Sequence, residues 1–354
     1  MTTSAETPAV LTAYDGVVCD LDGVVYRGDD AVPGAPEALQ RMAAHGTGLV
    51  YATNNASRVP AEVAAHLASL GAPAEPADVV TSAEAGAERL AGLVPTGSGV
   101  LALGGPGVVE ALTRSGLRPV APPDAVDGAA VEVAAVLQGF GRELTVRDFE
   151  TAARLLASGL PWVATNDDAT LPLPWGQSPG NGAYVVLLAT ATGRRPEVVG
   201  KPHPPLYRLA LNRLSTAPER TLAVGDRLDT DVAGALATGI DSAWVLTGVD
   251  RPSDLLARSL RPTYVIDSLA QLFEPYAVAW ADAGGWRCGD ARVHLADGDL
   301  VVDEVGASPV EAVRAGIAAF DGTRQAASDG RTGAVPDGRR VGTALDELLT
   351  APAR

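Results

Sequence analysis

The chain has 354 residues, of which 47% are hydrophobic and 20% charged, and its formal net charge at pH 7 is −16. This length corresponds to about two domains, and the composition is that of a folded protein. No run approaches ~18 uninterrupted apolar residues, so we expect no membrane span, and the acidic balance disfavours nucleic acid as a partner. Two cysteines are too few for a disulfide framework and no secretory signal pattern opens the chain, so we expect a reduced, cytoplasmic protein.

Strand and helix patterns alternate from residue 15 to residue 275. Short apolar runs predict strands at 16–21, 47–53, 79–82, 100–105, 133–139, 162–166, 221–226 and 242–248. Amphipathic stretches, several with a proline start or a glycine stop, predict helices at 35–46, 61–70, 145–158, 183–192, 204–215, 230–238 and 253–260. Alternation of this kind predicts βαβ units and mostly parallel sheets, in an α/β fold.

These strands are too many for one small sheet, so the chain is predicted to divide. Residues 1–96 and 196–275 would form a doubly wound, Rossmann-like core, and residues 97–195 an inserted α/β lobe. From residue 276 to residue 354 the pattern changes. Short antiparallel strands with Gly-Asp turns, a helix at 308–320, a turn-rich stretch at 327–340 and a last helix at 343–351 predict a small α+β appendage.

Two groups of polar residues lie at the carboxyl ends of predicted strands. Asp20 and Asp22 lie at the end of the first strand, and a glycine after them permits the turn that would bring both carboxylates to one site. Thr53, Asn54 and Asn55 lie at the end of the second strand, where a hydroxyl, an amide and free N–H groups can cradle an oxyanion. Taken alone, either group also fits an ordinary strand-ending turn or helix cap.

The basic residues single out one position. The chain has 26 arginines and one lysine, Lys201, which stands before a proline and so favours an extended backbone. Arg replaces Lys easily on a solvated surface but poorly where a compact point charge is needed, which makes Lys201 a candidate functional residue. Asp226 ends the predicted strand at 221–226, and Asp231 lies at the start of the helix predicted after it. Several carboxylates beside Asp20 are costly unless a hard cation lies among them.

In the order D-x-D, T-N-N, K-P and G-D-x-x-x-x-D, these groups resemble the motifs of the haloacid dehalogenase superfamily, over residues 15–275. DLDGVVYRG, YATNNASR, VVGKP and AVGDRLDTD are similar to members whose type IIA cap is inserted between the second and third motifs. The string ATNDDATLPLPWGQSPGNGAYVVLLATATGR resembles the caps of the 4-nitrophenyl, phosphoglycolate and glycerol-3-phosphate phosphatase group. On this resemblance, the inserted lobe is a cap.

The resemblance implies a Mg²⁺-dependent phosphatase of small phosphorylated metabolites that works through an aspartyl-phosphate. Glycerol 3-phosphate is the favoured substrate, and phosphoglycolate or another sugar or metabolite phosphate is the alternative. Asp20 would be the nucleophile, and Asp22 the acid and base that serves the leaving group and the attacking water. Asp20, the backbone carbonyl of Asp22, and Asp226 would hold Mg²⁺. Asp231 would lie outside the direct ligands and fix waters or Lys201.

Further residues would bind the substrate on the same resemblance. Thr53, Asn54 and Asn55 would hold the phosphoryl group, and Lys201 would offset charge on it and on Asp20. Two cap residues would contact the remainder of the substrate: Asn166 and Asp168.

Other functions are weighed against this one. Asp22 argues against a dehalogenase, which needs no acid for its leaving group. A phosphomutase shares the aspartates, and release of free phosphate would distinguish it from a phosphatase. A non-catalytic phosphate-binding protein would be expected to lose at least one of four charged residues, all of which are present here: Asp20, Asp22, Lys201 and Asp226. The appendage could be an acetyltransferase-like remnant, but residues 276–354 hold no Q/R-x-x-G-x-G/A turn for acyl-CoA. It is expected to be structural or to form a homodimer.

Overall fold

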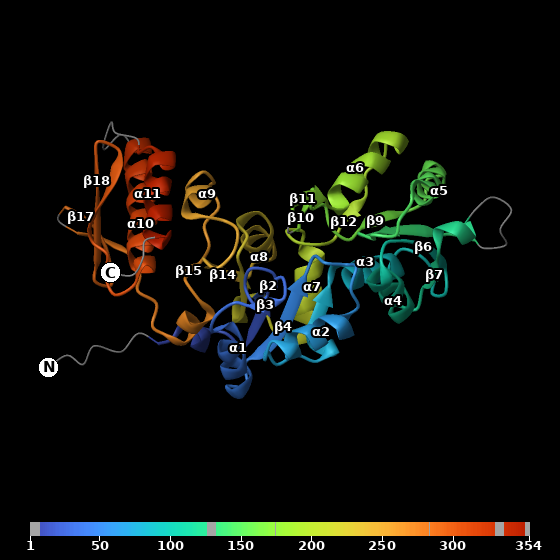
Figure 1. Ribbon diagram of the computed structural model, residues 1–354, viewed down its shortest axis with the longest axis horizontal. Coiled ribbons are helices and arrows are strands. Elements are labelled where there is room, and N and C mark those ends of the chain that lie inside the picture. Colours follow the sequence, from blue (N-terminus) through green and yellow to red (C-terminus); the bar gives the residue numbers. More distant parts are fainter. Residues whose placement is uncertain (1–7, 126–131, 174, 283, 330–335, 351–354) are drawn as a thin grey trace.

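The structure is a computed structural model, and it describes residues 8–125, 132–173, 175–282, 284–329 and 336–350. Three bodies follow one another along the long axis of the molecule, each with its own sheet (Figure 1). The core lies in the middle, the cap on one side of it and the appendage on the other (Figure 1). The described helices include none with the length and hydrophobicity needed to span a bilayer.

The core sheet holds parallel strands in the order β15-β14-β13-β1-β4-β5. Helices cover both faces, so these strands are continuous apolar runs rather than alternating ones. The strands are β1 (Gly16–Cys19), β4 (Gly48–Thr53), β5 (Val79–Thr81), β13 (Thr221–Gly225), β14 (Asp241–Val245) and β15 (Tyr264–Ile266).

Successive residues of β1 point to opposite faces of this sheet. Val17 and Cys19 belong to the apolar cluster that includes α1 (Ala35–Ala44) and α2 (Pro60–Ser69). Val18 belongs to the cluster that includes α3 (Ser82–Ala91), α7 (Pro204–Leu214) and α8 (Ala233–Thr238). The predicted doubly wound α/β architecture is confirmed.

The cap has a second parallel sheet, in the order β12-β9-β8-β6-β7. Its strands are β6 (Gly99–Leu103), β7 (Arg118–Val120), β8 (Ala135–Gln138), β9 (Trp162–Ala164) and β12 (Glu197–Val198), so its last strand lies just beyond the predicted range 97–195. Its helices are α4 (Pro106–Arg114), α5 (Val146–Ala157) and α6 (Asn181–Thr192), and a hairpin joins β10 (Thr170–Leu173) to β11 (Gly176–Pro179).

Helix α3 joins the two sheets, because it packs on β5 of the core and on β8 and β9 of the cap. The sequence pattern did not predict this helix, since Gly86 in its middle lowers helix propensity. A Cβ at Gly86 would lie 2.6 Å from Cδ1 of Leu137, so the glycine permits the close packing of α3 on the cap. Helix α4 was missed as well.

The appendage has an antiparallel sheet in the order β16-β17-β18-β19, as predicted. Its strands are β16 (Trp280–Asp282), β17 (Gly285–Cys288), β18 (Ala291–Ala296) and β19 (Asp299–Glu304), and its helices are α10 (Pro309–Ser328) and α11 (Gly338–Thr350). Both helices are longer than predicted and extend into the turn-rich stretch, of which residues 330–335 lie outside the described residues. Conversely, α9 (Pro252–Leu256) of the core ends before the predicted residue 260.

Candidate active site

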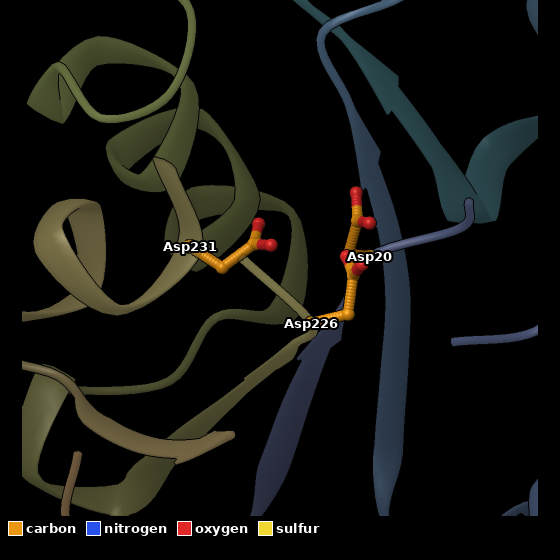
Figure 2. Close-up of side chains that lie close together, drawn as sticks. All are labelled: Asp20, Asp226 and Asp231. Atoms are coloured by element: carbon orange, nitrogen blue, oxygen red, sulfur yellow. The ribbon is translucent and has the colours of Figure 1, made fainter. Parts of the chain in front are cut away.

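Three carboxylates meet at the carboxyl ends of the core strands. Asp20 follows β1, Asp226 follows β13, and Asp231 lies in the π-helical turn Leu228–Val232 (Figure 2). One oxygen from each carboxylate lies within 4.8 Å of the others. Parallel strands place their carboxyl ends along one edge of the sheet, which is why residues far apart in the sequence meet here.

Lys201 lies among these carboxylates and is 3% exposed. Its Nζ donates to Asp20 Oδ1, to Asp231 Oδ1 at 2.7 Å and to the carbonyl of Ala52 at 3.1 Å, so all three ammonium hydrogens have an acceptor. Burial by itself lowers the pKa of the Lys201 amine, but the carboxylates of Asp20 and Asp231 outweigh it and hold the pKa well above its ordinary value. Lys201 is therefore a fixed positive charge.

Two hydrogen bonds and two closely approaching glycines fix the position of Asp226. Its backbone carbonyl accepts from Trp244 Nε1 at 2.9 Å, and its Oδ2 accepts from the backbone N–H of Val249 at 2.8 Å. A Cβ at Gly248 would lie 1.8 Å from Oδ2, and one at Gly23 would lie 2.5 Å from it, so both glycines allow the chain to approach this carboxylate closely. Burial, and then the charge of Asp231, raise the pKa of Asp226 to about 7.

The Oδ1 atom of Asp226 is buried and has no hydrogen-bond partner. Burial also raises the pKa of Asp20, against the opposing charge of Lys201. Three ionised carboxylates and one ammonium leave an excess of negative charge in a buried space, which costs free energy unless a cation offsets it. Oxygen ligands of this kind suit a hard divalent cation, and the unpartnered Oδ1 is a free ligand atom for one.

Asp22 lies in the loop between β1 and the small hairpin of β2 (Tyr26–Arg27) and β3 (Asp30–Ala31). The backbone N–H of Gly23 donates to the carbonyl of Tyr26 at 2.8 Å, and Thr247 Oγ1 donates to the carbonyl of Gly23 at 2.6 Å, which fixes the loop. The Asp22 side chain is accessible to solvent. Desolvation by the surrounding chain nevertheless raises its pKa, which favours the protonated carboxyl group.

The residues after β4 divide into two kinds. Thr53 Oγ1 accepts from the N–H of Asn55 at 3.0 Å, and Asn55 Oδ1 accepts from the N–H of Ser57 at 3.0 Å, which shapes the turn. The Asn54 side chain is fully used elsewhere: its Oδ1 accepts from the N–H of Lys201 at 2.8 Å and its Nδ2 donates to the carbonyl of Lys201 at 2.9 Å. Its side chain thus links β4 to the Lys201 segment.

The two cap residues lie in this same junction. Asp168 Oδ2 accepts from Asn54 Nδ2 at 3.1 Å, and burial raises the pKa of Asp168. Asn166 is 4% exposed; its Nδ2 donates to the carbonyl of Asn54 at 2.8 Å, and its own carbonyl accepts from Asn181 Nδ2 at 2.7 Å. The structure therefore brings Asp168 toward the core strands and places Asn166 inside the core–cap junction.

Sequence reasoning missed two contributors. Arg227 pairs with Asp229 through two hydrogen bonds of 3.1 and 3.0 Å, and one of its nitrogens lies 4.0 Å from Asp168 of the cap. Residues 247–250 follow β14 and hold Asp226, and Asp250 Oδ2 accepts from the N–H of Leu228 at 2.6 Å. The strand-end rule that singled out Asp20 and Asp226 could have pointed to this loop as well.

Two family descriptions match the sequence: a haloacid dehalogenase-like hydrolase over residues 17–118 and a HAD-hydrolase-like family over residues 198–272. The D-glycerol 3-phosphate phosphatase of Mycobacterium tuberculosis is 39% identical over 302 residues, 82% of this chain and 81% of the relative. Human chronophin is 37% identical over 278 residues, 75% of this chain and 94% of the relative.

Solved structures agree with these relatives. The glycerol phosphate phosphatase of Mycobacterium tuberculosis in complex with magnesium has a TM-score of 0.74 and 36% identity, and the match covers 88% of this chain and 92% of that one. A calcium complex of the same enzyme matches equally well, with a TM-score of 0.74. A thermostable NPPase double mutant from Geobacillus stearothermophilus has a TM-score of 0.65 and 31% identity, over 73% of this chain and 97% of that one.

Proposed function

This chain belongs to the haloacid dehalogenase-like hydrolase family and is a phosphatase of that family, and from this premise we propose that it hydrolyses glycerol 3-phosphate to glycerol and phosphate. The extent of the match supports this substrate. The glycerol phosphate phosphatase structure matches 88% of this chain, more than residues 1–275 make up, so the match includes part of the appendage. The NPPase match covers 73%. A phosphoglycolate or other metabolite phosphatase is the alternative.

In the proposed reaction, an Asp20 oxygen attacks phosphorus as the bond from phosphorus to the glycerol oxygen breaks. Asp22 gives its proton to the departing alkoxide, which leaves as glycerol. Asp22 then takes a proton from water, which attacks the aspartyl-phosphate, releases phosphate and restores the Asp20 carboxylate. The ammonium of Lys201, which contacts Asp20, supports this assignment because it offsets charge on Asp20 and on the phosphoryl group.

We propose Mg²⁺ as the cofactor, held by Asp20, the backbone carbonyl of Asp22, and Asp226. The excess of negative charge and the unpartnered Oδ1 of Asp226 support this site, and Asp231 is assigned to holding Lys201. When bound, Mg²⁺ would stabilise the negative charge that develops on the phosphoryl oxygens. Thr53, Asn55 and the backbone N–H groups of their turn are proposed to hold the same oxygens, and Asn54 to fix the Lys201 segment beside them.

The leaving group is proposed to lie toward the cap, near Asp168. Its carboxylate can accept hydrogen bonds from hydroxyl groups such as those of glycerol, whereas it would repel the carboxylate of phosphoglycolate. Arg227 lies 4.0 Å from Asp168, and its positive charge would reduce the repulsion between Asp168 and the carboxylate of phosphoglycolate. Asn166 is proposed to act by holding the junction on which Asp168 depends. The free, buried thiols of Cys19 and Cys288 support the proposed cytoplasmic location.

Two measurements test the substrate and the nucleophile. With Mg²⁺ present, phosphate release from glycerol 3-phosphate should have a higher kcat/KM than release from phosphoglycolate or p-nitrophenyl phosphate. A higher kcat/KM for phosphoglycolate would make phosphoglycolate the substrate instead of glycerol 3-phosphate. Failure to release phosphate from any ester would favour a phosphomutase.

Asp20→Asn should abolish turnover while leaving the melting temperature close to that of the wild type, because the amide is nearly isosteric but cannot form the aspartyl-phosphate. With p-nitrophenyl phosphate, whose leaving group departs without a proton, Asp22→Asn should accumulate a phosphorylated protein, with phosphate release slowed by roughly 10²–10⁴. Retention of more than about a tenth of wild-type kcat by Asp20→Asn would remove this residue from the nucleophile role.

A further inference from the structure

One loop connects the candidate cation site to the side of the core that carries the appendage. Residues 247–250 contact the site at three points: Thr247 donates to the carbonyl of Gly23, Val249 donates to the Asp226 carboxylate, and Asp250 accepts from Leu228. Helix α9 begins directly after this loop, at Pro252. One short loop therefore joins α9 to the carboxylate of Asp226.

Helix α11 of the appendage fixes the first turn of α9. Asp346 accepts two hydrogen bonds from Ser253, one from its Oγ at 2.6 Å and one from its backbone N–H at 3.1 Å. A Cβ at Gly342 would lie 2.5 Å from the Cα of Ser253, so α11 approaches the backbone of α9 as closely as a glycine allows. The two helices lie side by side (Figure 1).

Apolar packing supports the same connection. Leu228, Val232 and Trp244 form one buried cluster with residues of α9, α10 and α11. Leu228 and Val232 begin and end the turn that carries Asp231, and Trp244 donates to the backbone carbonyl of Asp226. The segments that present both aspartates are therefore packed against the appendage as well as against the core.

We propose that the C-terminal appendage positions the Asp226 carboxylate for cation binding, and that Asp346 is a positioning residue acting through Ser253, α9 and residues 247–250. The inference rests on the proposed metal site. Without the two hydrogen bonds to Ser253, α9 and the loop gain freedom that cation binding must remove again. Groups bonded directly to metal ligands change metal affinity by ~10–100-fold, so a contact farther away should change it by about 3- to 10-fold.

The test is Mn²⁺ binding to the purified full-length protein, measured from the EPR signal of free Mn²⁺. Subtracting the titration of Asp226→Asn isolates the site of interest from other acidic groups. Asp346→Ala should raise the Mn²⁺ dissociation constant by about 3- to 10-fold. Asp346→Asn keeps an oxygen that can accept from Ser253 and should stay within about twofold of the wild type.

A matched control removes another contact between the appendage and the core. Ser308, at the start of α10, donates from its Oγ to Asp267 Oδ2 of the core at 3.1 Å, and Asp267 lies outside both α9 and residues 247–250. Ser308→Ala should lower the melting temperature without changing Mn²⁺ affinity. If it weakens Mn²⁺ binding as much as Asp346→Ala does, general loosening explains the effect and the proposal fails.

A folded Asp346→Ala protein that binds Mn²⁺ with the wild-type constant would also overturn the proposal. If that variant does not fold, Ser253→Ala, which removes only the Oγ bond, is judged by the same criterion. A wild-type protein without an Asp226-dependent Mn²⁺ site would instead overturn the metal assignment itself. The two failures are therefore distinguishable.

Discussion

At the scale of single residues, Asp226 carries a measurable pH dependence. Its pKa is about 7 in the metal-free folded protein, mainly because of burial, and about 3.9 in an unfolded chain. The folded state therefore binds the extra proton between these values, so the stability from this group is present below pH ~4 and is lost as pH rises through ~7. Relative to Asp226→Asn, the melting temperature of the metal-free wild type should fall between about pH 4 and about pH 7 and level off above that. Saturating Mg²⁺ should remove this fall. If the melting temperatures of the wild type and Asp226→Asn changed in parallel with pH in the absence of Mg²⁺, the raised pKa of Asp226 would be contradicted.

Lys201 offers a second residue-scale prediction, because it is the only lysine of the chain. Its amine is buried and has three acceptors, and its pKa is well above its ordinary value. An acetylating reagent should therefore modify the N-terminal amine of the folded protein and spare Lys201, which should react only after denaturation. Peptide mass mapping before and after denaturation measures this. Rapid modification of Lys201 in the folded protein would be inconsistent with the ion pairs described above.

At the scale of elements, the loop after β14 depends on a glycine. A Cβ at Gly248 would lie 1.8 Å from Asp226 Oδ2, so Gly248→Ala must displace either the loop or the carboxylate. We expect Mg²⁺ affinity to fall by about 10–100-fold, with a smaller change in melting temperature, as for other supports of a metal ligand. Gly92→Ala is the matched control, because its Cβ would meet its neighbours at 3.5 Å, an ordinary contact. Mg²⁺ affinity is measured as the Mg²⁺ concentration that gives half-maximal activity. An equal rise of this concentration in both variants would refute the argument.

At the scale of the whole molecule, the appendage and the core share one buried cluster. Val310, Val313 and Phe320 pack there with Trp244 and Val265 of the core sheet. A chain ending at residue 275 would expose this surface, at a cost of ~1.5–3 kcal/mol for each large apolar side chain. We expect the truncated protein to melt more than about 10 °C below the full chain and to bind a hydrophobic dye. Cooperative unfolding at the full-length temperature without dye binding would show that the core is independent.

The sequence by itself determined the alternation of buried strands and helices and the order of the charged motifs along them. These features are local: an apolar run of four to six residues has few alternatives to a strand covered on both faces, and a parallel sheet brings the carboxyl ends of its strands together. The meeting of Asp20 and Asp226 follows from those two facts, whereas Lys201 follows β12 of the cap sheet and Asp231 lies in the π-helical turn after β13. The antiparallel texture of the appendage was also evident, because turn residues stand between its short strands.

Only the tertiary structure decided how the polar groups at these strand ends are used. Asn54 and Asn55 are adjacent and chemically identical, yet Asn54 joins the Lys201 segment and the cap while Asn55 shapes its own turn. The Asp346–Ser253 contact joins residues 93 positions apart on two different elements. Local propensity and periodicity hold no information on such pairs, because they depend on which faces meet when α11 packs on α9 and the cap packs on the loop after β4. That packing is set by burial of apolar surface across the whole molecule.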